Sequence, residues 1–179
     1  MFRLFPKNRQ NRAIDTLHDR IAAASRQPQL YLALGVPDTL EGRFESLTLH
    51  MILVLRRLRR LPAPADDAAQ DLVDTLFRQL DRSLRELGVG DFGVPKRMKK
   101  LAQAFYERAE RYDPALDAAD ELALAEALGR SFFDEPRPTW ALARYALAAE
   151  AEMAALDLDG LLRQGPRFPL PDGFAKDTP

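Results

Sequence analysis

Few residues of this chain have the types and spacing that catalysis or metal binding needs. The sequence has no cysteine and two histidines, His18 and His50, and neither is followed by a metal-ligating residue three or four positions later. His50 lies in the middle of a predicted helix, and we expect its ring to pack with a single hydrogen bond. We expect His18 to lie on a polar face beside Asp19. The inventory predicts a protein that is not an enzyme and has no catalytic residues, metal site or cofactor.

One glycine-rich string matches a known fingerprint. Residues 88–93 read G-x-G-x-x-G, the pattern of a dinucleotide-binding loop. That loop has to follow a β-strand, because the turn must aim helix N–H groups at a pyrophosphate, and here a leucine-rich segment with helical spacing precedes it. We therefore expect a turn in which Gly88 ends one helix and Pro95 begins the next, and no small-molecule substrate.

Two basic clusters are candidates for binding. The first, Arg56, Arg57, Arg59 and Arg60, ends a predicted helix, where cations are favoured by the helix dipole. The second, Lys96, Arg97, Lys99 and Lys100, begins a predicted helix, where the dipole disfavours them by a few tenths of a kcal/mol each. Anionic lipid, RNA phosphates or an acidic protein would each explain the second cluster, and a solvated face is the alternative for both.

The net charge of −1 over 179 residues conceals an asymmetry. Residues 1–112 carry 20 basic and 14 acidic side chains, a net charge of +6, and residues 113–179 carry 6 and 13, a net charge of −7. This distribution argues against a uniformly basic nucleic-acid binder, and no pattern for sequence-specific nucleic-acid recognition is present. Basic residues interleaved with Phe2, Leu4 and Phe5 make the N-terminal arm similar to a weak membrane-surface anchor.

No segment approaches the roughly 20 apolar residues that a membrane-spanning helix needs, and no secretory signal is visible. We expect the protein in the bacterial cytoplasm, with peripheral contact at the inner face of the membrane as an alternative, or on the mitochondrial matrix side if it is eukaryotic.

The elements that would position these residues are helices almost throughout, because apolar residues recur at helical rather than alternating spacing. Their approximate bounds are 8–25, 38–61, 67–87, 95–113, 117–133 and 139–156. Capping boxes are predicted at Asp38 and Asp67, and Asp113-Pro114 is expected to end the fourth helix. The fold class is all-α, with a single compact multi-helix domain over residues 1–164 and an extended, partly mobile Pro-rich tail over 165–179.

Two blocks of sequence within these helices resemble the signatures of the ubiquinol–cytochrome c chaperone family. The first block is V-P-D-T-L-E-G-R-F-E at residues 36–45, and the second runs from L-R-E-L-G-V-G-D at 84–91 through K-R-M-K-K at 96–100 to Phe105-Tyr106. The resemblance extends over residues 29–116. Two departures, Pro95 and Glu107, stand where the family pattern favours glycine, and they affect the surface at the ends of that helix.

The resemblance implies an all-helical, non-enzymatic assembly factor of the respiratory chain that holds newly made apocytochrome b, or intermediates of the cytochrome bc1 complex. The polar part of the partner surface would then be Arg43, Glu45, Asp91, Lys96, Arg97, Lys99 and Lys100. Phe105 and Tyr106 fit a helix core better than a binding surface. The alternative is a peripheral membrane or ribosome adaptor that uses its basic face for a different client.

Overall fold

The computed structural model describes residues 7–133 and 137–175, and these form helices without any β-strand. The fold is all-α, as the helical spacing predicted. The elements are α1 (Lys7–Ala24), α2 (Pro28–Leu32), α3 (Leu40–Arg59), α4 (Ala65–Glu86), α5 (Val94–Ala118), α6 (Glu121–Phe132), α7 (Trp140–Met153), α8 (Leu158–Arg163) and the 3₁₀ helix η1 (Pro171–Phe174). Most of the predicted N-terminal arm, including Phe2, Leu4 and Phe5, lies outside the described residues.

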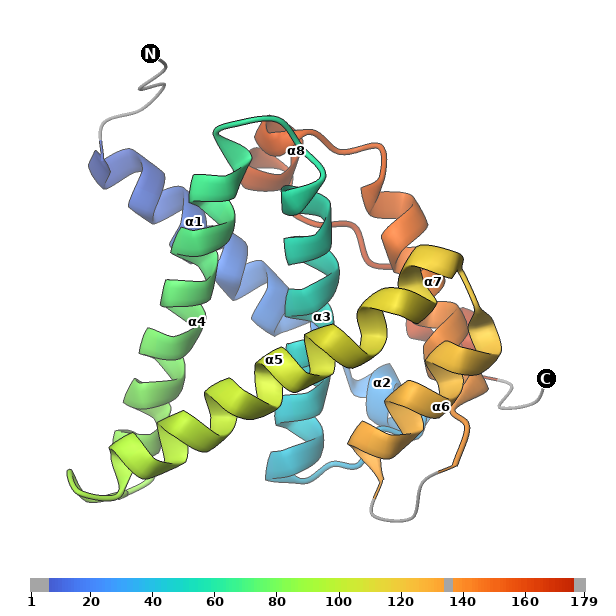
Figure 1. Cartoon of the computed structure of the whole chain (residues 1–179), viewed down its shortest axis with the longest axis horizontal. Helices are drawn as coiled ribbons and strands as arrows, with labels where there is room; N and C mark the ends of the chain where they lie inside the picture. The colour runs from blue at the N-terminus through green and yellow to red at the C-terminus, as the bar shows by residue number, and fades with distance from the viewer. Residues whose placement is uncertain (1–6, 134–136, 176–179) are drawn as a thin grey trace.

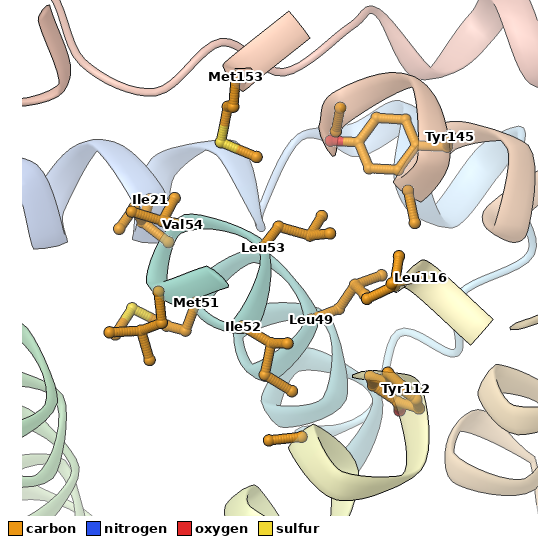
Figure 2. Close-up of a cluster of buried hydrophobic side chains, with 14 of the residues drawn as sticks. Ile21, Leu49, Met51, Ile52, Leu53, Val54, Tyr112, Leu116, Tyr145 and Met153 are labelled. Atoms are coloured by element: carbon orange, nitrogen blue, oxygen red, sulfur yellow. The ribbon is translucent and has the colours of Figure 1, made fainter. Parts of the chain in front are cut away.

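Helix α3 is the centre of the molecule. Its segment from Leu49 to Leu55 is buried on every side, because α1, α4, α5, α6 and α7 all contact it. Figure 2 shows side chains from the helices around α3, among them Ile21, Tyr112 and Met153, pointing toward it. A helix that is apolar all round is expected at the centre of a core. Within the described ranges, no helix is both long enough and apolar enough to span a membrane.

The start of α3 differs by one residue from the prediction. Thr39 is the N-cap, and its hydroxyl accepts a hydrogen bond from the Gly42 N–H at 3.0 Å. Asp38 instead pairs with Arg43. Gly42 packs directly against the Pro37 carbonyl, so that a side chain at this position would collide with backbone. The close return of residues 37–39 over the first turn therefore requires glycine.

Helix α4 begins earlier than the capping signal at Asp67 predicted. It starts at Ala65 behind Pro64, without a side-chain cap, and Asp66 and Asp67 lie in its first turn. Acidic side chains there interact favourably with the helix dipole, so the carboxylates support the helix start without capping it.

Helix α5 continues through Pro114 to Ala118, and the predicted break at Asp113-Pro114 is wrong. Arg56 of α3 donates hydrogen bonds to Asp113 at 2.5 Å and to Asp117 at 2.6 Å. The first aspartate precedes Pro114 in the sequence, and the second follows it. These two carboxylates share a face only if the chain stays helical between them. Tertiary contacts thus outweigh the missing backbone N–H of the proline.

Helices α6 and α7 begin and end within a few residues of their predicted bounds. Asp120 caps α6 by accepting a hydrogen bond from the Ala123 N–H at 3.0 Å, three residues after the predicted start at 117. In the middle of α6, Gly129 packs against the carbonyl of Arg137, which brings the segment before α7 onto this helix. The short helices α2 and α8 were not predicted, because five or six residues are too few to show a helical period.

The first part of the predicted tail lies on the core. Residues 165–170 have no regular secondary structure, and η1 follows. The Phe168 ring lies 4.7 Å from the His50 ring, and the Phe174 ring lies 5.9 Å from that of Tyr145. These two aromatic side chains join residues 165–175 to α3 and α7.

Both histidines differ from expectation. His50 makes two hydrogen bonds rather than one, to the Ser46 carbonyl at 2.7 Å and the Tyr145 hydroxyl at 2.8 Å. His18 is buried rather than on a polar face, and this burial lowers the pKa of its ring. Helical spacing alone places Leu17 in the core but does not reveal that the core extends one residue further around α1.

Candidate functional site

The cluster at Lys96–Lys100 lies at the turn between α4 and α5. Figure 1 shows this turn at the lower left, away from α6, α7 and α8, with α4 and α5 diverging from it. Gly88 has a φ of +79°, which ends α4, and the Gly93 N–H donates to the Gly90 carbonyl at 2.7 Å. The glycine string is therefore a helix–turn–helix connection, as predicted. We call residues 87–100 the hairpin tip.

Aromatic side chains hold the two helices together behind this tip. Phe77 of α4 lies edge-on to Phe105 of α5, with ring centroids 5.8 Å apart, and Phe105 packs in turn on Tyr106 at 5.5 Å. Phe105 is buried and Tyr106 is half exposed. The prediction of a core role therefore holds for Phe105, and Tyr106 adds an apolar surface beside it.

Burial along α4 fades toward the tip. Leu72 and Leu76 are fully buried, and Leu80 and Leu84 are partly buried. Leu87 is 64% exposed, although the sequence spacing predicted that it would continue the buried row. The periodicity is unbroken, but no third element covers this end of the two-helix hairpin, so spacing alone could not predict the loss of burial.

The tip carries an excess of positive charge. Lys96, Arg97, Lys99 and Lys100 are all exposed, and none of them forms an ion pair with another described residue. Asp91 supplies the only carboxylate of the tip, and it pairs with Arg85 at 2.6 Å. The structure thus brings five of the seven predicted partner-binding residues together on one projection.

Glu45 is not part of this surface or of any other. Its side chain is buried against Arg108 of α5, with an N–O distance of 2.8 Å. Burial raises the pKa of the Glu45 carboxyl, while the hydrogen bond from Arg108 opposes that rise. Glu45 therefore joins α3 to α5, and in this structure its burial keeps the side chain away from the polar surface where it was expected.

Arg43 lies on a different surface, where α2 meets the start of α3. Its guanidinium pairs with Asp38 at 2.8 Å, and the hydrogen bond to Asp38 raises the pKa of Arg43. A hollow of about 390 Å³ lies beside this pair. The residues lining this α2–α3 hollow are Arg26, Pro28, Tyr31, Leu32, Asp38 and Arg43. Leu32 is 85% exposed, so the hollow offers apolar surface next to charge.

The first arginine cluster is mostly internal. Arg56 is buried and bonds Asp113, Asp117 and Glu150, and Arg57 donates to the Leu156 carbonyl at 2.8 Å. Burial alone would lower the pKa of Arg56, but its hydrogen bonds to the carboxylates raise it, so it stays charged. This cluster ties α3 to α5 and α7, and of its four arginines Arg59 alone is exposed and without an ion pair to another described residue.

The described part of the chain offers few side-chain groups for catalysis or metal binding. Across residues 7–133 and 137–175, no three histidine, aspartate or glutamate side chains are grouped so that they could hold a metal ion. Both nitrogens of His50 are already bonded inside the core. The features that sequence reasoning missed are apolar: Phe92 and Leu32 are the most exposed large apolar residues. The sequence did contain a signal for Phe92, because it is an aromatic residue within a glycine-rich turn between two helices.

Comparison with known proteins agrees with this architecture. A crystal structure described as the Cbp3 homolog from Brucella abortus superposes with a TM-score of 0.80 at 39% sequence identity, covering 93% of this chain and 94% of that one. A search of curated proteins found no match. The family model described as ubiquinol-cytochrome C chaperone matches residues 32–168. Because this match spans most of the helical domain, the chain belongs to the ubiquinol–cytochrome c chaperone family.

Proposed function

We propose that this protein is a non-enzymatic chaperone that holds newly made cytochrome b for assembly into the cytochrome bc1 complex. The observation that carries the proposal is the match to the Cbp3 homolog, which extends over almost the full length of both chains. A likeness of this extent includes both surfaces described above, at α2–α3 and at the hairpin tip. We further propose that it works in the bacterial cytoplasm near the inner face of the membrane, or on the matrix side in a mitochondrion.

The surfaces support binding of an apolar client. A holdase needs exposed apolar side chains for the client and charged groups that keep the free protein soluble. Exposed Leu32 lines the α2–α3 hollow together with the Arg43–Asp38 pair, and Leu40 at the start of α3 is also exposed. This combination suits an apolar segment with a polar flank, so we propose the hollow as a client contact.

Deletion of the gene tests the role in assembly. We expect assembled bc1 complex to be lost, and to return when the wild-type chain is supplied. Client identity is tested by placing a photo-crosslinking amino acid at Leu32 and, as a matched control, at exposed Leu122 of α6. Cytochrome b should be captured from position 32 and not from 122. Normal bc1 levels in the deletion strain would contradict the proposal, as would capture of a different membrane protein from position 32.

A second candidate is an adaptor that brings a different client to a membrane or ribosome. The four unpaired cations of the hairpin tip favour it. The same deletion strain separates the two candidates, because an adaptor for another client would leave cytochrome b assembly intact.

A further inference from the structure

The most exposed large hydrophobic side chain among the described residues is at the apex of the α4–α5 turn. Phe92 is 103% exposed, so its ring makes almost no contact with the protein, and Leu87 at the end of α4 is 64% exposed. Exposing a phenylalanine completely gains nothing for folding, because its transfer from water is favourable wherever an apolar environment is available. The position therefore calls for an environment outside this chain.

The cations beside Phe92 are arranged along one side of α5. Lys96, Lys99 and Lys100 are separated by three and four positions, which places them on one helix face, and Arg97 adjoins them. Their charges lie in the first turns of α5, where the helix dipole makes cations unfavourable. No intramolecular contact among the described residues offsets this cost, since none of the four has an ion-pair partner there.

Carboxylates near the tip are already occupied by arginines of α4. Arg85 binds both Asp81 at 2.8 Å and Asp91 at 2.6 Å, and Arg82 binds Glu86 at 2.8 Å. Because these acidic groups are paired, they do not cancel the charge of α5. Residues 81–100 hold six basic and three acidic side chains, a net charge of +3.

We propose that the hairpin tip is a wedge that binds the surface of an anionic phospholipid bilayer. Phe92 and Leu87 would enter the boundary between headgroups and acyl chains, and the four cations would contact lipid phosphates. A lipid surface accounts for both features, the apolar apex and the surrounding cations. An RNA strand would account for the cations and could stack a base on Phe92, but it would leave the exposed aliphatic Leu87 without a role.

The test uses the full chain and vesicles of phosphatidylcholine with or without phosphatidylglycerol, separated by flotation. We expect binding only to the anionic vesicles. Phe92→Ser should weaken it roughly tenfold, because the apolar anchor is lost. Replacing Lys96, Arg97, Lys99 and Lys100 by glutamine should weaken it by at least about a hundredfold, since each cation near such a surface contributes roughly fivefold.

Matched controls keep the result specific to the tip. Leu170→Ser removes another exposed apolar side chain, and glutamine at Arg12, Arg59, Arg130 and Arg167 removes four exposed cations elsewhere. Neither control should lower vesicle binding by more than about twofold, apart from the general effect of net charge. Circular dichroism at helix wavelengths must be unchanged in every variant.

Insertion itself is measured with Phe92→Trp in a Trp140→Phe background. Its fluorescence should be quenched by phospholipids that carry bromine on their acyl chains. Failure of the wild-type chain to float with anionic vesicles would overturn the proposal. So would binding that ignores Phe92→Ser and lacks quenching, or sedimentation with ribosomal RNA in place of vesicles. Because the assay contains no client, its failure is distinct from failure of the chaperone assignment.

Discussion

At the scale of single residues, His50 shows how the core uses a polar side chain. The Ser46 carbonyl can only accept a hydrogen bond, so Nδ1 of His50 carries the proton and donates it. Nε2 then accepts from the Tyr145 hydroxyl. Phe168 covers the ring, and burial lowers the pKa of His50 to about 4. The ring is neutral at physiological pH, and a second proton on Nε2 would place an unpaired positive charge in the core and reverse the hydrogen bond, with the Tyr145 hydroxyl as acceptor.

This geometry predicts a pH dependence of stability. In the unfolded chain the pKa of His50 returns to its ordinary value of 6.5, so the unfolded state takes up a proton first as the pH falls. The contribution of His50 to the free energy of unfolding is complete above pH 6.5 and is lost as the pH falls to about 4. The loss amounts to about 3 kcal/mol.

The measurement is urea unfolding of the wild type and His50→Gln across this pH range. The carboxylates and buried His18 titrate in both proteins, so the difference between the two curves isolates His50. We expect the gap between the two free energies of unfolding to shrink by about 3 kcal/mol from pH 7 to pH 4. A constant gap would show that the His50 pKa is not lowered.

At the scale of elements, the Arg56 cluster joins α3 to two of the helices around it, α5 and α7. The Arg56 guanidinium pairs with Asp113 and Asp117 of α5 and with Glu150 of α7. The more exposed Arg60 side chain also pairs with Asp117 and Glu150. The hydrogen bond from Arg56 lowers the pKa of Asp117, and the latter remains ionised. The continuation of α5 beyond Pro114 depends on this arrangement.

Arg56→Ala should lower the free energy of unfolding by about 2 kcal/mol. Removing the buried cation leaves three carboxylates close together, and the full penalty for a buried pair is reduced here because Asp117 is exposed. Arg59→Ala, three residues further along the same helix and exposed, should change it by less than about 0.5 kcal/mol. Equal effects of the two substitutions in urea unfolding would exclude a special role for the cluster.

Substitution of Gly129 should also lower the stability of the helix packing. A methyl group there meets the Arg137 carbonyl, and the segment before α7 must move away from α6. We expect Gly129→Ala to cost about 2–3 kcal/mol of stability, the usual range for overpacking. Gly173→Ala is the control, because nothing lies near the position of its added methyl group. A neutral or stabilising Gly129→Ala in thermal unfolding would contradict the close approach.

The elements also show how far sequence reasoning reaches. Helix existence follows from the period of apolar residues, which is why the long helices were predicted. Boundaries depend on contacts between distant segments: Thr39 caps α3 because residues 37–39 fold over Gly42, and α5 passes Pro114 because Arg56 holds it. A single sequence without known contacts cannot supply these.

At the scale of the whole molecule, the predicted partner surface divides. All seven residues were assigned by resemblance to a family. Asp91 and the four cations lie together because they belong to one turn and the helix that follows it. The fold separates Arg43, which is exposed, from Glu45, which is buried between α3 and α5. A motif contains positions needed for folding as well as positions needed for binding, and only burial distinguishes them.

The segment after Gln164 gives a further prediction. A boundary at 164 was expected from composition, yet Phe168 and Phe174 pack on His50 and Tyr145. A chain ending at Gln164 should lose about 2–3 kcal/mol of stability through the loss of these two half-buried aromatic contacts. A chain ending at Ala175 keeps them and serves as the control. Equal melting temperatures for the two shortened chains would show that the domain is complete at 164.

The central position of α3 has a consequence for synthesis on the ribosome. Residues that complete its surroundings come late in the chain: Arg56 needs Glu150, and His50 needs Tyr145 and Phe168. Synthesis proceeds from the N-terminus, so the middle helix is made well before the side chains that enclose it. The nascent chain can complete this core only after Phe168 has emerged, so the surroundings of α3 close long after α3 itself has been made.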